Sequence, residues 1–123
     1  MYSERLLDHF QNPRNVGEIE DADLRAEVSN PICGDILRLT ANLSGERIGQ
    51  IAYKARGCTA SIAVGSALTV ILLGKTEQEV LDLNRNEIEE AVGGLSNESK
   101  HAAVLAVDGI KALANHWRER GAA

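Results

Sequence analysis

The chain has 123 residues, of which 44% are hydrophobic and 25% are charged, and its net charge is −5 at pH 7. These values predict one globular domain over residues 1–123, and the negative charge argues against a nucleic-acid partner because phosphate binding needs a basic face. No apolar run is long enough to span a bilayer, and residues 1–10 lack the apolar core of a signal peptide. We therefore expect a cytoplasmic protein without a membrane partner, in which both cysteines stay reduced.

Caps, turns and hydrophobic periodicity predict the elements along the chain. Ser3 is a helix N-cap, Gly45 permits the positive φ of a hairpin turn, and Thr76 with Glu79 forms a capping box. The predicted elements are a helix over 3–12, a short strand over 25–29, strands over 35–43 and 47–57, and helices over 58–74, 76–83, 86–94 and 96–121.

This order predicts an α+β fold with a small antiparallel three-stranded sheet, helices packed on one face and a long C-terminal helix. The last helix carries a broad apolar stripe, made of Val104, Leu105, Val107, Ile110, Ala114 and Trp117. With one sheet face covered by helices, the strand ends and helix starts remain free to build a site.

The motif Cys33-Gly34-Asp35 lies where a loop is expected to become a strand. Pro31 stiffens the approach, and Gly34 removes the side chain that would keep a ligand from the backbone. In extended backbone Cys33 and Asp35 point to the same side, because side chains alternate along a strand. A thiolate beside a carboxylate indicates a metal site; a buried cysteine next to a turn aspartate is the alternative interpretation of this motif.

Cys58 and His101 lie at two further element boundaries. Cys58 follows Gly57 and opens a predicted helix, where the helix dipole favours the thiolate; its alternative role is a small core residue. His101 lies near the start of the last helix, where a lone histidine is more often a surface or packing residue. Together, Cys33, Asp35, Cys58 and His101 supply two thiolates, a carboxylate and an imidazole. Four such ligands suit tetrahedral zinc or one edge of an iron–sulfur cluster.

Other chemistry has less support in the sequence. Dinucleotide-binding glycine motifs, a P-loop and a zinc-protease motif are missing, and no serine has the context of a catalytic triad. His9 and His116 lie on predicted helices, and we expect them to be surface or packing residues.

Four stretches of the sequence resemble the U-type iron–sulfur cluster scaffolds, the family of IscU, SufU and the N-terminal domain of NifU. They are YSERLLDHFQNPRNVGEIE, PICGDILRL, GCTASIAVGSALTVILLGK and HAAVLAVDGIKAL. They cover nearly the whole chain, in the order and at the spacing of the family. The insertion that marks the SufU branch is missing between Cys58 and the last helix, so the IscU-like branch is nearer.

The resemblance implies a scaffold rather than an enzyme. On such a scaffold a 2Fe–2S cluster is built, with sulfur delivered as persulfide by a cysteine desulfurase, and the cluster then passes to acceptor proteins. The family's ligands are three cysteines and an aspartate, with a histidine beside the third cysteine. The matching residues here are Cys33, Asp35, Cys58 and His101, and zinc is the other metal expected on the purified protein.

The family's third cysteine, which accepts sulfur, corresponds to Ala102, and alanine has no thiol. Three explanations are open. His101 completes a site that still binds zinc or a cluster, the chain is a diverged member that carries metal or clusters without accepting persulfide, or the substitution is engineered. A zinc-bound sulfur relay and a regulator of the desulfurase are the alternative functions. The loop before His101 lacks the proline-containing segment of chaperone-assisted members, so handoff through a chaperone is doubtful.

Overall fold

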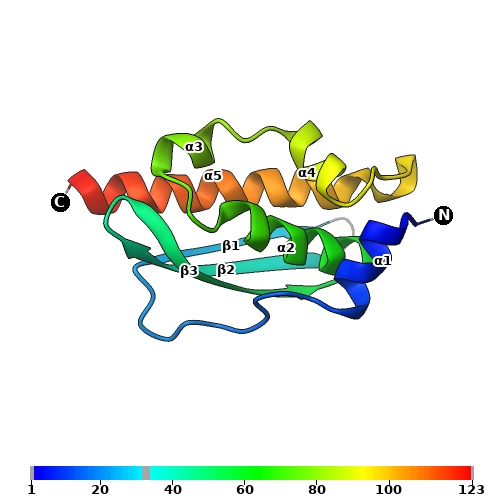
Figure 1. Ribbon diagram of the computed structural model, residues 1–123, viewed down its shortest axis with the longest axis horizontal. Helices are drawn as coiled ribbons and strands as arrows, with labels where there is room; N and C mark the ends of the chain where they lie inside the picture. Colours follow the sequence, from blue (N-terminus) through cyan, green and yellow to red (C-terminus); the bar gives the residue numbers. More distant parts are fainter. Residues whose placement is uncertain (1, 32–33, 123) are drawn as a thin grey trace.

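The computed structural model describes residues 2–31 and 34–122, and its elements follow the predicted order (Figure 1). Within the described residues, no helix combines the length and the hydropathy that crossing a membrane requires. The elements are α1 (Glu4–Gln11), β1 (Leu24–Asn30), β2 (Asp35–Ser44), β3 (Arg47–Arg56), α2 (Thr59–Leu72), α3 (Glu77–Leu81), α4 (Arg85–Ala91), the 3₁₀ turn η1 (Asn97–Ser99) and α5 (Lys100–Ala122).

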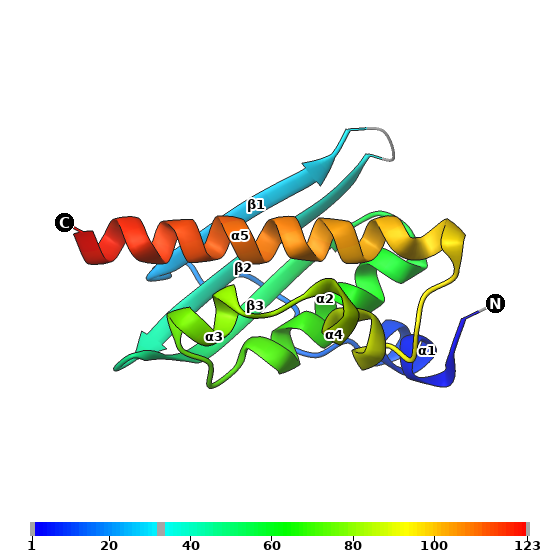
Figure 2. The ribbon, with the colours of Figure 1, turned by 90° about the horizontal axis from the view of Figure 1, so that it is seen from above.

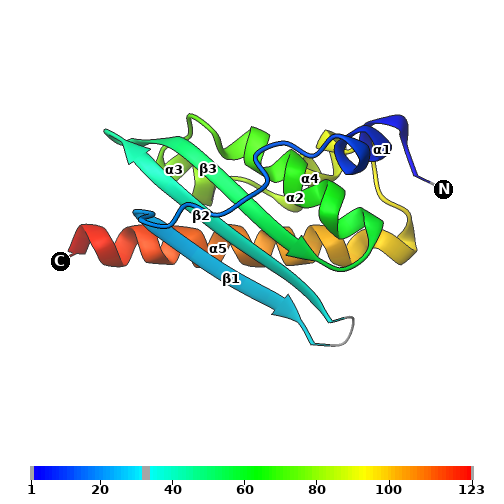
Figure 3. The same cartoon turned by 90° about the horizontal axis from the view of Figure 1, so that it is seen from below.

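The three strands form one antiparallel sheet in the order β1-β2-β3, as predicted. Gly45 turns the β2–β3 hairpin with a φ of 63°. Along β2, Leu37 and Leu39 are buried while Arg38 between them is exposed, which is the alternation expected of a sheet with one covered face. The helices lie on that face; residues 15–17 pair with the edge of β3, and the chain that follows crosses the opposite face toward β1 (Figures 1 and 3). The predicted fold class is confirmed.

Helix α2 is the central element, because ten of its fourteen residues are buried. It packs on β3 beside α5 and also contacts α1 and α4 (Figure 2). Small residues permit this close packing: a Cβ added to Gly65 would lie 2.6 Å from Cε2 of Tyr53 on β3. The helix ends at Leu72, and Gly74 then turns the chain with a φ of 84°.

The last helix differs from its prediction in two respects. It begins at Lys100, because residues 97–99 form the turn η1 instead of the first helical turn. Val104 is 44% exposed, so its assignment to the apolar stripe was wrong. Val107 is partly buried, and the other predicted members, Leu105, Ile110, Ala114 and Trp117, are buried. Helix α5 packs chiefly on β1 and α2.

Three polar residues join α1 to α2. Nδ1 of His9 lies 2.8 Å from Oγ of Ser66 and accepts a hydrogen bond from Nη1 of Arg14 at 3.1 Å. The backbone N–H of Arg14 also donates to Ser66 Oγ at 2.9 Å. Burial and the Arg14 guanidinium hold the pKa of His9 below its ordinary value of 6.5, although Asp8 opposes the shift. The folded protein therefore favours neutral His9.

This contact predicts a stability loss in mild acid. As the pH falls below 6.5, the unfolded chain takes up a proton at His9 that the folded chain does not, so the free energy of unfolding decreases. We expect His9→Gln to cost about 1 kcal/mol near neutral pH through the weakened hydrogen bond, and to flatten the pH dependence. Urea unfolding at neutral pH and in mild acid measures both effects. His116→Gln is the control, and equal pH dependence in wild type and His9→Gln would contradict the prediction.

Candidate metal centre

Three of the four predicted ligands meet at one end of the sheet. Ligand atoms of Asp35, Cys58 and His101 all lie within 4.8 Å of one another. His101 Nε2 is 3.3 Å from Asp35 Oδ2 and 3.4 Å from Cys58 Sγ, and Cys58 Sγ is 3.9 Å from Asp35 Oδ2. Three atoms with lone pairs thus converge on one point, and they repel one another unless a proton or a cation lies between them.

Each of these side chains lies at the end of an element. Asp35 is the first residue of β2, Cys58 is the N-cap of α2 two residues after the end of β3, and His101 is the second residue of α5. The end of β3 and the starts of α2 and α5 lie at the same end of the molecule (Figure 2). The sheet register and the packing of both helices therefore bring together residues that are far apart in sequence.

Gly57 allows the carboxylate to reach this point. Its φ is +150°, a conformation that L side chains rarely adopt, and an added Cβ would lie 2.4 Å from Asp35 Oδ1. The carboxylate therefore packs directly against the backbone that leads into Cys58. Asp35 is 3% exposed, whereas Cys58 and His101 are partly exposed, so a buried acid lies beneath two accessible donors.

The turn η1 fixes the orientation of His101. Its Nδ1 lies 3.0 Å from the carbonyl oxygen of Glu98, which can only accept, so Nδ1 carries a proton. In the neutral ring the lone pair is then on Nε2, the atom that faces Asp35 and Cys58. Metal-binding histidines commonly show this arrangement, in which one ring nitrogen binds and the other donates to a carbonyl. The three residues fit a thiophilic metal ion or cluster.

Ser61 also lies in this group of side chains, although it was not among the residues predicted from the sequence. Its Oγ lies 2.6 Å from Asp35 Oδ2 and 3.3 Å from Cys58 Sγ. The one signal available was its position three residues after Cys58, which places both side chains near the same turn of a helix.

Two predicted features lie outside this geometry. Cys33 falls outside the described residues, so its part in the site stays a prediction. Ala102, next to His101, is 1% exposed and belongs to the hydrophobic core.

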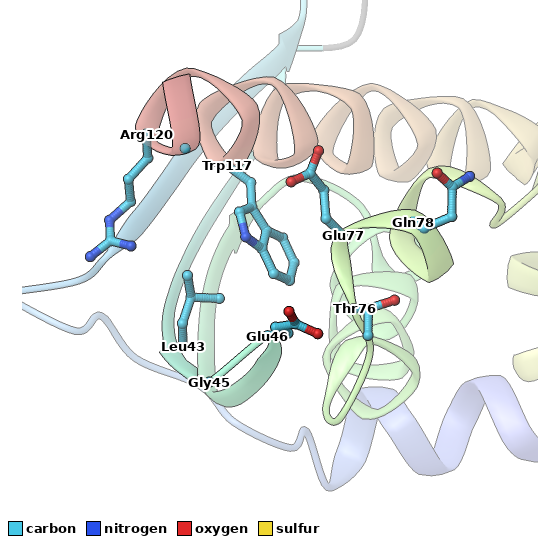
Figure 4. A pocket seen from close by; sticks show the side chains of 9 residues that line it. Leu43, Gly45, Glu46, Thr76, Glu77, Gln78, Trp117 and Arg120 are labelled. Carbon is cyan, nitrogen blue, oxygen red and sulfur yellow. The ribbon is translucent and has the colours of Figure 1, made fainter. Parts of the chain in front are cut away.

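A separate pocket lies far from the cluster. Trp117 and Arg120 of α5 line it together with residues of the β2–β3 hairpin and α3 (Figure 4). Trp117 lies sixteen positions after His101 on α5, which is about 24 Å along a helix. This pocket and the candidate metal centre are therefore independent features.

Comparison with known proteins identifies the family. The NifU-like N terminal domain matches residues 1–123. The iron-sulfur cluster assembly scaffold protein IscU 1 of Archaeoglobus fulgidus is 43% identical over 122 residues, which cover 98% of this chain and 80% of that protein. The scaffold protein IscU of Azotobacter vinelandii is 34% identical over 123 residues, covering 97% and 95%.

Solved structures share the fold. The putative SUF-system scaffold protein of Fervidobacterium islandicum superposes with a TM-score of 0.72 at 22% identity, covering 92% of this chain and 96% of that one. A NifU-like protein (N-terminal) from Brucella abortus gives 0.68 at 17% identity, covering 98% and 94%. The chain belongs to the NifU-like N-terminal domain family, the IscU-like iron–sulfur cluster assembly scaffolds.

The close approach of Gly57 to Asp35 predicts that adding one methyl group at position 57 weakens metal binding. Gly57→Ala strains the backbone by about 1–3 kcal/mol and displaces the carboxylate, so we expect zinc affinity to fall at least about tenfold. Competition with a chromogenic chelator measures the affinity.

Gly17→Ala is a matched control, because Gly17 has a similar φ of +143° but no atom within 4 Å of an added Cβ. It should lose stability and keep its zinc affinity. Equal affinities in the two variants would contradict the steric account.

Proposed function

We propose that this protein is a non-catalytic scaffold that holds a 2Fe–2S cluster transiently and passes it to acceptor proteins. The observation that carries the proposal is the convergence of Asp35, Cys58 and His101 within 4.8 Å, in a chain of a scaffold family. Cys33 is the proposed fourth ligand, two residues before Asp35 in the sequence.

The proposed donor set matches the needs of a cluster. A 2Fe–2S cluster takes four terminal ligands, two on each iron, and imidazole can replace thiolate at some of them. Cys33 and Cys58 would supply thiolates, His101 a neutral nitrogen and Asp35 an oxygen. Carboxylate oxygen is a harder ligand than thiolate and suits cluster iron less well. Asp35 is therefore the weakest of the four proposed ligands, and a weak ligand favours release of the cluster to an acceptor.

Sulfur delivery to this chain cannot use a third cysteine as the acceptor, as a three-cysteine scaffold would. The chain has two cysteines, and Ala102 has no thiol. We propose a cysteine desulfurase as the source: the thiolate of Cys33 or Cys58 would attack the terminal sulfur of the persulfide on the desulfurase's cysteine, and that cysteine would leave as its thiolate. Cys58 is partly exposed and therefore accessible to a donor.

Replacing Asp35, the hard carboxylate ligand, tests the proposed scaffold function. We expect Asp35→Ala, reconstituted anaerobically with iron and sulfide, to hold its cluster several times longer than wild type against a chelator. The physical reason is that removal of the carboxylate takes away the ligand that matches iron–sulfur chemistry least. The decay of the visible absorption gives the lifetime.

Asp21→Ala, at an exposed loop position, is the control and should match wild type. An unchanged or shorter lifetime in Asp35→Ala would refute the role given to the carboxylate.

A further inference from the structure

Ser61 contacts two of the proposed ligands. It lies in the first turn of α2, is 3% exposed, and its Oγ lies 2.6 Å from Asp35 Oδ2 and 3.3 Å from Cys58 Sγ. A buried helical serine or threonine often bonds to a carbonyl of its own helix, as Thr69 does with Ser66 at 2.7 Å. The Ser61 hydroxyl is directed instead at side chains of the site.

The direction of these hydrogen bonds follows from the available protons. An ionised carboxylate can only accept, so the single hydroxyl hydrogen of Ser61 points to Asp35. The other two atoms near Oδ2, His101 Nε2 and Cys58 Sγ, can donate only while they are protonated. A cation bound at this site would engage the lone pairs of both atoms, so neither atom would donate to Asp35. Ser61 Oγ makes the shortest of these contacts with Oδ2, at 2.6 Å, and its hydroxyl can donate whether or not a cation is bound.

We propose that Ser61 is a positioning residue, which holds the Asp35 carboxylate in the geometry that binds metal. Gly57 packs against Oδ1, and Ser61 donates to Oδ2, so the two contacts fix both oxygens. This inference rests on the proposed function, because it assigns Ser61 to the same metal site. Outer contacts of this kind typically change metal affinity by about 10–100-fold when they are removed.

The test uses zinc as the probe and two serines of the same helix. Ser61→Ala removes the hydroxyl, and alanine is favourable in a helix, so the variant should fold. Ser66→Ala is the matched control, because Ser66 is also fully buried in α2 but bonds to His9 and Arg14. We expect Ser61→Ala to bind zinc about 10–100-fold more weakly than wild type, and Ser66→Ala to bind it within about twofold.

A double-mutant cycle shows whether Ser61 acts through Asp35. In an Asp35→Ala background, adding Ser61→Ala should change the zinc affinity by less than about twofold, because the carboxylate that Ser61 holds is gone. A merely structural role would give the same loss in both backgrounds.

The outcomes separate this inference from the proposed function. If wild type and Ser61→Ala bind zinc with equal affinity, the role of Ser61 is overturned and the proposed function is not. The same conclusion follows if Ser61→Ala and Ser66→Ala lose equal zinc affinity. If Ser61→Ala lowers the zinc affinity as much in the Asp35→Ala background as in wild type, the role of Ser61 is also overturned. Wild type that binds neither zinc nor a cluster removes the proposed function and the inference with it.

Discussion

One carboxylate, held out of water, ties the candidate metal centre to the rest of the fold. Burial of an ionised acid is costly unless it is hydrogen-bonded or paired, and Asp35 is almost fully buried. Gly57 provides the space, Ser61 the short hydrogen bond, and His101 and Cys58 the partners at the open side. The first residue of β2 is thereby tied to the N-terminal turns of α2 and α5. The fold and the site share these contacts, so a change in one affects the other.

The buried position of Ala102 bears on how the site can work. In the first turn of α5, His101 faces the candidate metal centre, whereas the side chain of Ala102 packs in the hydrophobic core. The methyl group of Ala102 contributes packing and has no redox chemistry. The sulfur chemistry proposed for this chain therefore rests on its two cysteines. The Asp35–Ser61 hydrogen bond orients one of the proposed ligands of a site that has fewer thiols.

Much of the fold could be predicted from the sequence because its signals are local. The Thr76 capping box, the Ser3 N-cap and the Gly45 turn each depend on a few neighbouring residues, and the structure shows all three. Asp35, Cys58 and His101 were found at element boundaries and through the family resemblance, and the structure brings them together. Their role as ligands remains a proposal.

The remaining features depend on contacts between distant segments, which local patterns do not encode. From the sequence, Ser61 is a small residue in a predicted helix, and its contact with Asp35 arises only when the fold places β2 beside it. The clash that any side chain on Gly57 would cause likewise exists only in the packed structure. The 3₁₀ turn before α5 and the exposure of Val104 depend on how the last helix lies on its neighbours. Periodicity alone gives the helix but not its exact first turn.

The most direct test of the central claim is the metal and sulfide content of protein purified anaerobically without added metal. Iron, zinc and acid-labile sulfide are measured per chain in wild type and in Cys58→Ala. The account predicts iron and sulfide in equal amounts in wild type and their loss in the variant. Zinc without sulfide would contradict the cluster and favour a zinc-bound relay. Folded wild type with neither metal nor sulfide would contradict a functional metal centre at Asp35, Cys58 and His101.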